Sequence, residues 1–168
     1  MNQDSSGETN SVQEKLKIRD DLLDQYEGKV GLPTLQELKL SEEIQGYLSL
    51  TREEMDRLSP EDCAEIGVRL EQTSFSVQRF LNKEVSHVTW AKSALKLHIA
   101  DRLANYRGSF AQQESQAIKE DGYATKLDSV ITYAQQRCDR LAYISSSLTR
   151  QADRLYNLQM SKSRRTNT

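Results

Sequence analysis

The residues best suited to chemistry are basic side chains between positions 92 and 107. At about 100° per residue of a helix, Lys92, Lys96 and Arg107 fall within a sector of about 60°. Arg102 borders the same helix face on the opposite side. Cations at helical spacing bind phosphates without reading bases, so this pattern predicts salt-dependent binding to nucleic acid. The alternative is that these side chains form only a solvated helix face.

Two aromatic residues lie beside these cations. Trp90, the only tryptophan, is off the apolar stripe and close to Arg79 and Lys83. It either stacks on a base, as aromatic side chains do in basic grooves, or packs against the connector or a neighbouring subunit. Tyr106 precedes Arg107 but also lies on the apolar stripe, so both a binding role and a core role are open for it.

Catalytic and metal-binding patterns are not found. The sequence has no G-x-S-x-G, phosphate loop or H-E-x-x-H. His87 and His98 are 11 positions apart, and adding Cys63 and Cys138 gives no recognised zinc spacing. We therefore predict no catalytic residue, metal or cofactor, and interpret both histidines as surface or flanking residues. Two cysteines without a partner motif favour a reducing, cytoplasmic compartment.

Charge is divided unevenly along the 168 residues, although the formal net charge is only −2. Residues 1–66 carry 16 acidic and 7 basic residues, a net of −9, whereas residues 67–168 carry 9 and 16, a net of +7. This division favours a polyanionic partner for the second part. Neither a spanning apolar run nor an apolar leader is present, so we expect no membrane association.

The elements that must position these residues are expected to be helices. Ser59-Pro60-Glu61-Asp62 is a typical helix start, and no proline follows Pro60, so we expect a helix from about Pro60 to Arg107. The helix should bury one amphipathic stripe. Its members are Ile66, Leu70, Val77, Leu81, Val85, Val88, Leu95, Ile99, Leu103 and Tyr106.

A second long helix is expected after a connector with a short helix over 110–119. Apolar residues repeat there in a heptad register typical of a coiled coil, with Arg137 and Gln151 at two of its positions. The sequence is thus predicted to divide into four segments: a disordered tail at 1–11, an acidic arm of short helices at 12–58, a helical core at 59–160 and a basic tail at 161–168. Within the acidic arm, Thr51 is predicted to begin a helix with a capping box. The heptad residues are Leu127, Val130, Ala134, Leu141, Ile144, Leu148, Leu155 and Leu158.

These patterns predict an all-α protein built as an elongated hairpin of two long amphipathic helices with short N-terminal helices. The first long helix alone would measure about 72 Å. A hairpin of this kind would leave much apolar surface in water, so we expect several copies to associate as a homo-oligomeric helical assembly.

Residues from about Leu81 to Met160 resemble the UvsY-like recombination mediators of T-even-like phages. The resemblance rests on K-L-H-I-A-D-R-L-A-N-Y-R-G-S at 96–109 and on a second helical segment from 126 to 144. Arg102 and Tyr106 match basic and aromatic positions implicated in DNA binding in that family. Ala100 stands where the family has a lysine, and Lys96 is about one and a half turns earlier.

The resemblance implies an oligomeric phage protein of the host-cell cytoplasm that binds single-stranded DNA. Such proteins act in DNA recombination and repair by helping a recombinase to displace single-strand-binding protein. The sequence alone therefore predicts a recombination mediator that contacts DNA through Lys92, Lys96, Arg102, Tyr106, Arg107 and Trp90. The alternative is a helical structural or assembly protein of a phage, such as a scaffold or virion component. The acidic arm would contact a partner protein or compete with DNA for the basic face.

Overall fold

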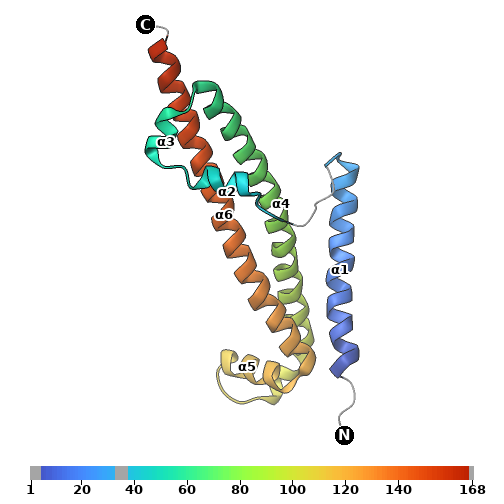
Figure 1. The fold of residues 1–168 in the computed structure, drawn as a ribbon. Coiled ribbons are helices and arrows are strands. Elements are labelled where there is room, and N and C mark those ends of the chain that lie inside the picture. The colour runs from blue at the N-terminus through green and yellow to red at the C-terminus, as the bar shows by residue number, and fades with distance from the viewer. Residues whose placement is uncertain (1–4, 33–37, 167–168) are drawn as a thin grey trace. The chain divides into compact units, whose positions relative to one another are not determined.

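The computed structural model describes residues 5–32 and 38–166 of the chain, and all regular elements in these ranges are helical. This confirms the all-α prediction. Figure 1 shows the helices in chain order. They are α1 (Ser5–Lys29), α2 (Glu42–Leu48), α3 (Arg52–Arg57), α4 (Pro60–Ile99), the 3₁₀ helix η1 (Ala100–Asn105), α5 (Phe110–Glu120) and α6 (Gly122–Thr166).

The predicted helix starts are confirmed by their side-chain caps. Thr51 and Glu54 form a reciprocal capping box at the start of α3. At the start of α4 the Ser59 hydroxyl accepts from the Asp62 N–H at 3.0 Å, and the Asp62 carboxylate accepts from the Ser59 N–H at 3.1 Å. These bonds satisfy amide groups that have no partner within the first helical turn.

The first long helix ends earlier than we predicted. The α-helix stops at Ile99, and the chain continues as η1 before Tyr106 becomes extended. Gly108 then takes a φ of 116°, a conformation that glycine adopts without the steric cost paid by other residues. Tightening of the last turns into a 3₁₀ helix explains why the apolar periodicity continues to Tyr106 although the α-helix does not.

The helices also extend into both segments that we predicted as tails. α1 begins at Ser5, so residues 5–11 are helical, whereas residues 1–4 of the predicted disordered tail lie outside the described residues. At the other end α6 continues to Thr166. Lys162 donates from Nζ to the carbonyl oxygens of Met55, Asp56 and Leu58, which anchors this end of α6 to the end of α3.

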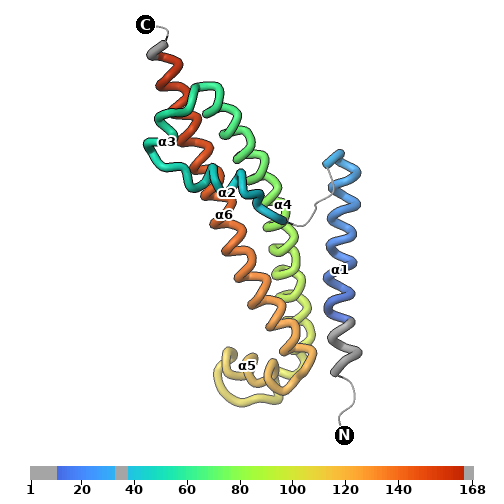
Figure 2. Tube along the Cα trace, in the orientation of Figure 1, coloured from blue at the N-terminus to red at the C-terminus, as the bar shows by residue number. Residues whose placement is uncertain are grey.

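The chain forms two compact units that cut across the predicted division at residue 59. We call residues 1–34 with 82–138 the α1 unit, and residues 35–81 with 139–168 the α2 unit. The tube in Figure 2 allows these segments to be followed by residue number. α4 and α6 each contribute one part to each unit, so each unit has its own core.

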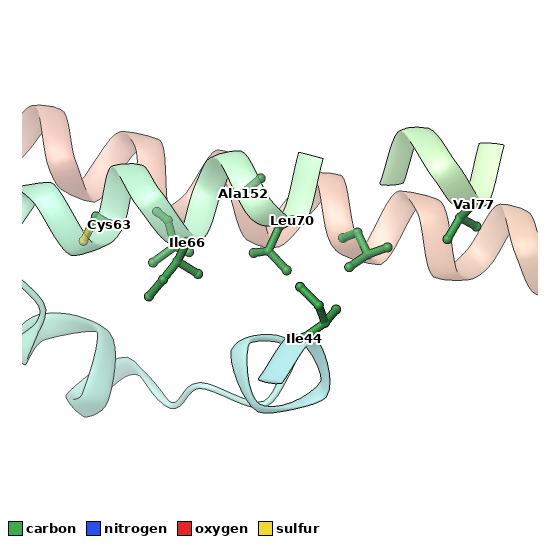
Figure 3. Close-up of a cluster of buried hydrophobic side chains, with 8 residues drawn as sticks. Ile44, Cys63, Ile66, Leu70, Val77 and Ala152 are labelled. Atoms are coloured by element: carbon green, nitrogen blue, oxygen red, sulfur yellow. The ribbon is translucent and has the colours of Figure 1, made fainter. Parts of the chain in front are cut away.

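The α2 unit packs its parts of α4 and α6 antiparallel, with α2 and α3 against them. Ser74 lies 3.0 Å from the Ser145 hydroxyl, whereas Gly67, two turns earlier on α4, faces the carbonyl of Ala152, two turns later on α6. Figure 3 shows Ile44 of α2 pointing toward the side chain of Leu70. The buried cluster comprises Ile44, Cys63, Ile66, Leu70, Val77, Leu148, Ala152 and Leu155.

The α1 unit has a second core, again around antiparallel parts of α4 and α6. Arg137 bonds Glu84 at 2.8 Å, and the rings of His98 and Tyr123 lie 4.9 Å apart, so later residues of α4 meet earlier residues of α6. The buried cluster comprises Val12, Ala91, Leu95, Ile99, Ala117, Ala124 and Leu127. α1, α4, α5 and α6 therefore all contribute to this core.

Other helices of the same chain cover much of the apolar stripe of α4, with α6 contributing to both buried clusters. Leu70, Val77 and Ile99 are fully or almost fully buried, whereas Val85 remains 47% exposed. The stripe is therefore not a continuous apolar surface in this fold. Exposed apolar side chains are found instead at scattered positions such as Phe75 and Leu97.

Candidate nucleic-acid interface

Lys92 and Lys96 meet at one groove of the α1 unit. Both side chains are exposed on α4, and the groove is also lined by Phe110 and Lys119 of α5 and by Asp128 of α6. Neither Lys92 nor Lys96 has an ion-pair partner in the described part of the chain. Phe110 is 65% exposed, so an aromatic ring lies at the same groove as two cations that form no ion pair among the described residues.

α5 is fixed beside α4 by its two ends and by its apolar face. Ser109 and Gln112 form a capping box that starts the helix directly after Gly108. Ala117 of α5 is fully buried in the core of the α1 unit. Asp121 ends α5 and accepts from the Ala124 N–H at 2.8 Å, which begins α6. Hydrogen-bonded caps therefore fix both ends of α5, the helix that forms one side of the groove.

Arg102 does not join this groove but forms an ion pair with Asp121. His98 also lies 3.0 Å from the Asp121 carboxylate, which is itself only 9% exposed. Burial raises the pKa of Asp121, but the Ala124 N–H together with His98 and Arg102 outweighs it and holds the pKa below its usual range. Arg102 thus carries a partly neutralised charge, unlike Lys92 and Lys96.

Tyr106 and Arg107 lie at the chain reversal between η1 and α5. The Tyr106 hydroxyl donates to Glu120 at 2.9 Å, and this bond to a carboxylate raises the pKa of the phenol. Its ring is half-buried against the core of the α1 unit. Gln113 donates to the Tyr106 carbonyl at 3.0 Å and holds the turn. Arg107 is exposed beside it.

Trp90 is partly buried and packs against the same core. Packing within the chain is one of the roles considered for Trp90, and the same core includes Ile118 and Tyr123 of the predicted connector. Of its predicted basic neighbours, Arg79 is buried in the α2 unit and Lys83 bonds Asp24 of α1 at 2.6 Å. This side of α4 is therefore occupied by other parts of the same chain.

A polar network that the sequence analysis missed joins α1 to α4. His87 Nε2 lies 2.7 Å from Asp20, and its Nδ1 lies 3.5 Å from Glu84. Arg19 donates to the Ser86 hydroxyl at 3.1 Å. His87 is only 9% exposed, so our interpretation of it as a surface or flanking residue was wrong. The signal was present, since Asp20 and Asp24 share the four-residue spacing of Lys83 and His87.

Protonation of His87 is favoured by its neighbours. The carboxylate of Glu84 beside Nδ1 raises the pKa of His87, burial opposes this, and Asp20 raises it further. Burial raises the pKa of Glu84, but His87 and Arg137 outweigh it and lower that pKa. The network therefore holds alternating charges, negative on Asp20 and Glu84 and positive on His87 and Arg137.

Within the described residues, no group of three or more His, Cys, Asp or Glu side chains could hold a metal ion. Cys63 and Cys138 are both buried, and neither is part of a disulfide bond. No helix in the described ranges is both long and apolar enough to cross a membrane. No protein-family model, curated protein or solved structure matches the chain.

Proposed function

We propose that this chain is a non-catalytic protein that binds single-stranded DNA through the groove of the α1 unit. The observation that carries the proposal is the exposed pair Lys92 and Lys96 beside Phe110, with no carboxylate paired to either lysine in the described residues. Lysine side chains bind phosphates as point charges, and an exposed ring stacks on unpaired bases. The single-stranded form is favoured because its bases are free to stack.

The acidic residues of the groove limit how strongly one chain binds. Glu114 and Asp128 line the same groove as Lys92, Lys96 and Lys119, so its net charge is only about +1. Weak sites of this kind become effective when several copies act on one strand, because later contacts are then intramolecular. The proposal therefore includes homo-oligomerisation of an elongated helical hairpin.

The specific cellular role follows from the resemblance to UvsY-like mediators. In this role the protein acts in the cytoplasm of a phage-infected cell, where it helps a recombinase displace single-strand-binding protein during recombination and repair. Arg102 and Tyr106 would contact DNA only after release from Asp121 and Glu120, because both are bonded to these carboxylates. Lys92, Lys96 and Arg107 need no such release among the described contacts.

The experiment is a titration of a fluorescent single-stranded oligonucleotide at 50 and 300 mM salt. If Lys92, Lys96, Lys119 and Arg107 each contact one phosphate, the affinity should fall about 150-fold over this range, and the double substitution Lys92→Gln/Lys96→Gln should reduce that loss to about 12-fold. The matched control is Lys17→Gln/Lys29→Gln, which removes two exposed cations from α1. Absence of binding by the unmodified protein at 50 mM salt would rule out the proposal.

A structural or assembly protein is the second candidate, and exposed apolar side chains favour it. Val68 and Phe75, two turns apart on α4, are 53% and 55% exposed, and Leu97 is 78% exposed. Such side chains commonly mark contacts with other proteins. Light scattering separates the candidates when combined with the DNA titration. Assembly without DNA binding supports the structural role, whereas a monomer at micromolar concentration contradicts self-association.

A further inference from the structure

One face of α6 in the α2 unit combines arginines with an exposed tyrosine. The residues Arg140, Tyr143, Ser147, Arg150 and Arg154 follow steps of three, four, three and four. At about 100° per residue they lie within a sector of about 80°. The three arginines and the tyrosine are exposed, and Ser147 is half-buried. We call these five residues the α6 strip.

The arginines of the α6 strip have no ion-pair partner among the described residues. Arg150 instead donates to the Ser146 carbonyl at 3.2 Å and to the Ser147 hydroxyl at 3.4 Å. By contrast Arg69, also exposed in this unit, pairs with Glu43 and Glu65. Arg154 donates to the Gln151 side chain at 3.5 Å, so in the described part of the chain the strip holds positive charge that is bonded only to neutral groups.

The carboxylates of α6 next to the strip in sequence lie at its border rather than within it. Asp139 precedes Arg140, and Asp153 projects from α6 about 60° outside the strip. Asp56 of α3 lines a small pocket with Arg154, but Arg52 lines the same pocket and offsets its charge. The five positions of the strip therefore carry three positive charges and no carboxylate.

Tyr143 supplies the aromatic component of the strip. Its side chain is 69% exposed and belongs to neither buried cluster, so its ring contributes little to folding. Exposed aromatic rings beside arginines are the usual platform for unpaired bases, because every base offers a face for stacking. This residue distinguishes the strip from a surface that would attract any polyanion equally.

We propose that the α6 strip is a second binding surface for single-stranded nucleic acid. Arg140, Arg150 and Arg154 bind phosphates, and Tyr143 stacks on a base. The strip is about 21 Å long, which corresponds to about six stacked nucleotides at 3.4 Å per nucleotide. The inference rests on the proposed function and extends it from the α1 unit to the α2 unit.

The test is the same oligonucleotide titration with two variants of the strip. Arg150→Gln/Arg154→Gln should reduce the slope of log affinity against log salt by about 1.4, which corresponds to two phosphate contacts. Tyr143→Ser should weaken binding about fivefold or more without changing that slope. Tyr143→Phe keeps an aromatic ring and should bind with the affinity of the unmodified protein. The matched control is Tyr156→Ser, because Tyr156 is 60% exposed on the opposite side of α6 in the same unit.

The outcomes separate this inference from the proposed function. Suppose that the unmodified protein binds the oligonucleotide and that Lys92→Gln/Lys96→Gln weakens this binding. If either strip variant then binds as tightly as the unmodified protein, the inference about the α6 strip is overturned, whereas the proposed binding groove stands. If Tyr156→Ser or the α1 control Lys17→Gln/Lys29→Gln weakens binding as much as the strip variants, the effect is unspecific and the inference also fails. Absence of binding by the unmodified protein overturns both.

Discussion

The attachment of α1 to α4 should depend on pH through His87. Because Asp20 and Glu84 raise the pKa of His87 in the folded state, protonation contributes stability. That contribution is complete below the ordinary histidine pKa of about 6.5 and is lost as pH rises through the higher folded value. Glu84 has a lowered pKa, so its contribution is already complete above pH 5 and stays constant in this window.

The magnitude follows from the contacts of His87. A hydrogen bond to a charged group contributes about 1.5–3 kcal/mol. The Asp20 side chain is 34% exposed, so solvent screening reduces its share, and we expect His87→Gln to cost about 1–2 kcal/mol at pH 6. At pH well above the folded pKa of His87, the same substitution should cost about 1 kcal/mol or less, because only neutral hydrogen bonds are lost.

Two measurements test this expectation. Urea unfolding at pH 6 and pH 9 gives the free energy of unfolding, and hydrogen exchange of the α1 amides reports whether α1 itself is released. The unmodified protein should lose stability and α1 protection as pH rises, whereas His87→Gln should show a smaller dependence. Asp20→Asn should fall between them. Equal pH dependence of the unmodified protein and His87→Gln would refute the reasoning.

Three further predictions concern the cores, a cap and the acidic arm. Leu70→Ala should reduce the free energy of unfolding by about 2–5 kcal/mol because Leu70 is fully buried, whereas Leu97→Ala, at a 78% exposed site, should change it by less than about 0.5 kcal/mol in the same urea titration. Ser59→Ala should cost about 1 kcal/mol by loss of the α4 cap, seen as a lower thermal midpoint. Asp20→Asn/Asp24→Asn should tighten oligonucleotide binding at 50 mM salt, and weaker binding would contradict a shielding role for α1.

Local features of the fold were predictable because they depend on neighbouring residues. The Thr51 and Ser59 caps and the helix after Ser109 follow from short-range hydrogen bonding, which a sequence displays directly. The end of α4 at Ile99 was not predictable from periodicity. It coincides with contacts from His98 and Arg102 to Asp121, more than 18 positions away. Contacts of that range are not visible in a helical pattern.

The candidate site was predictable only in part for the same reason. Spacing on one helix correctly grouped Lys92 with Lys96, and the structure adds Phe110 and Lys119 from α5 to their groove. Spacing could not show which cations are already neutralised. Arg102 is paired with a carboxylate distant in sequence, whereas Lys92 and Lys96 are not.

Each unit combines acidic residues of the predicted arm with basic residues from the second part of the sequence. The predicted acidic arm is not one element, because α1 belongs to one unit and residues 38–58 belong to the other. Ile44 is buried in the core of the α2 unit, so this part of the arm is needed for folding. In the α1 unit, Asp20 and Asp24 neutralise His87 and Lys83. Glu43 of α2 also pairs with a cation of α4, Arg69, but α1 belongs to the same unit as the groove of Lys92 and Lys96, so α1 is the part of the arm that we expect to compete with a polyanion there.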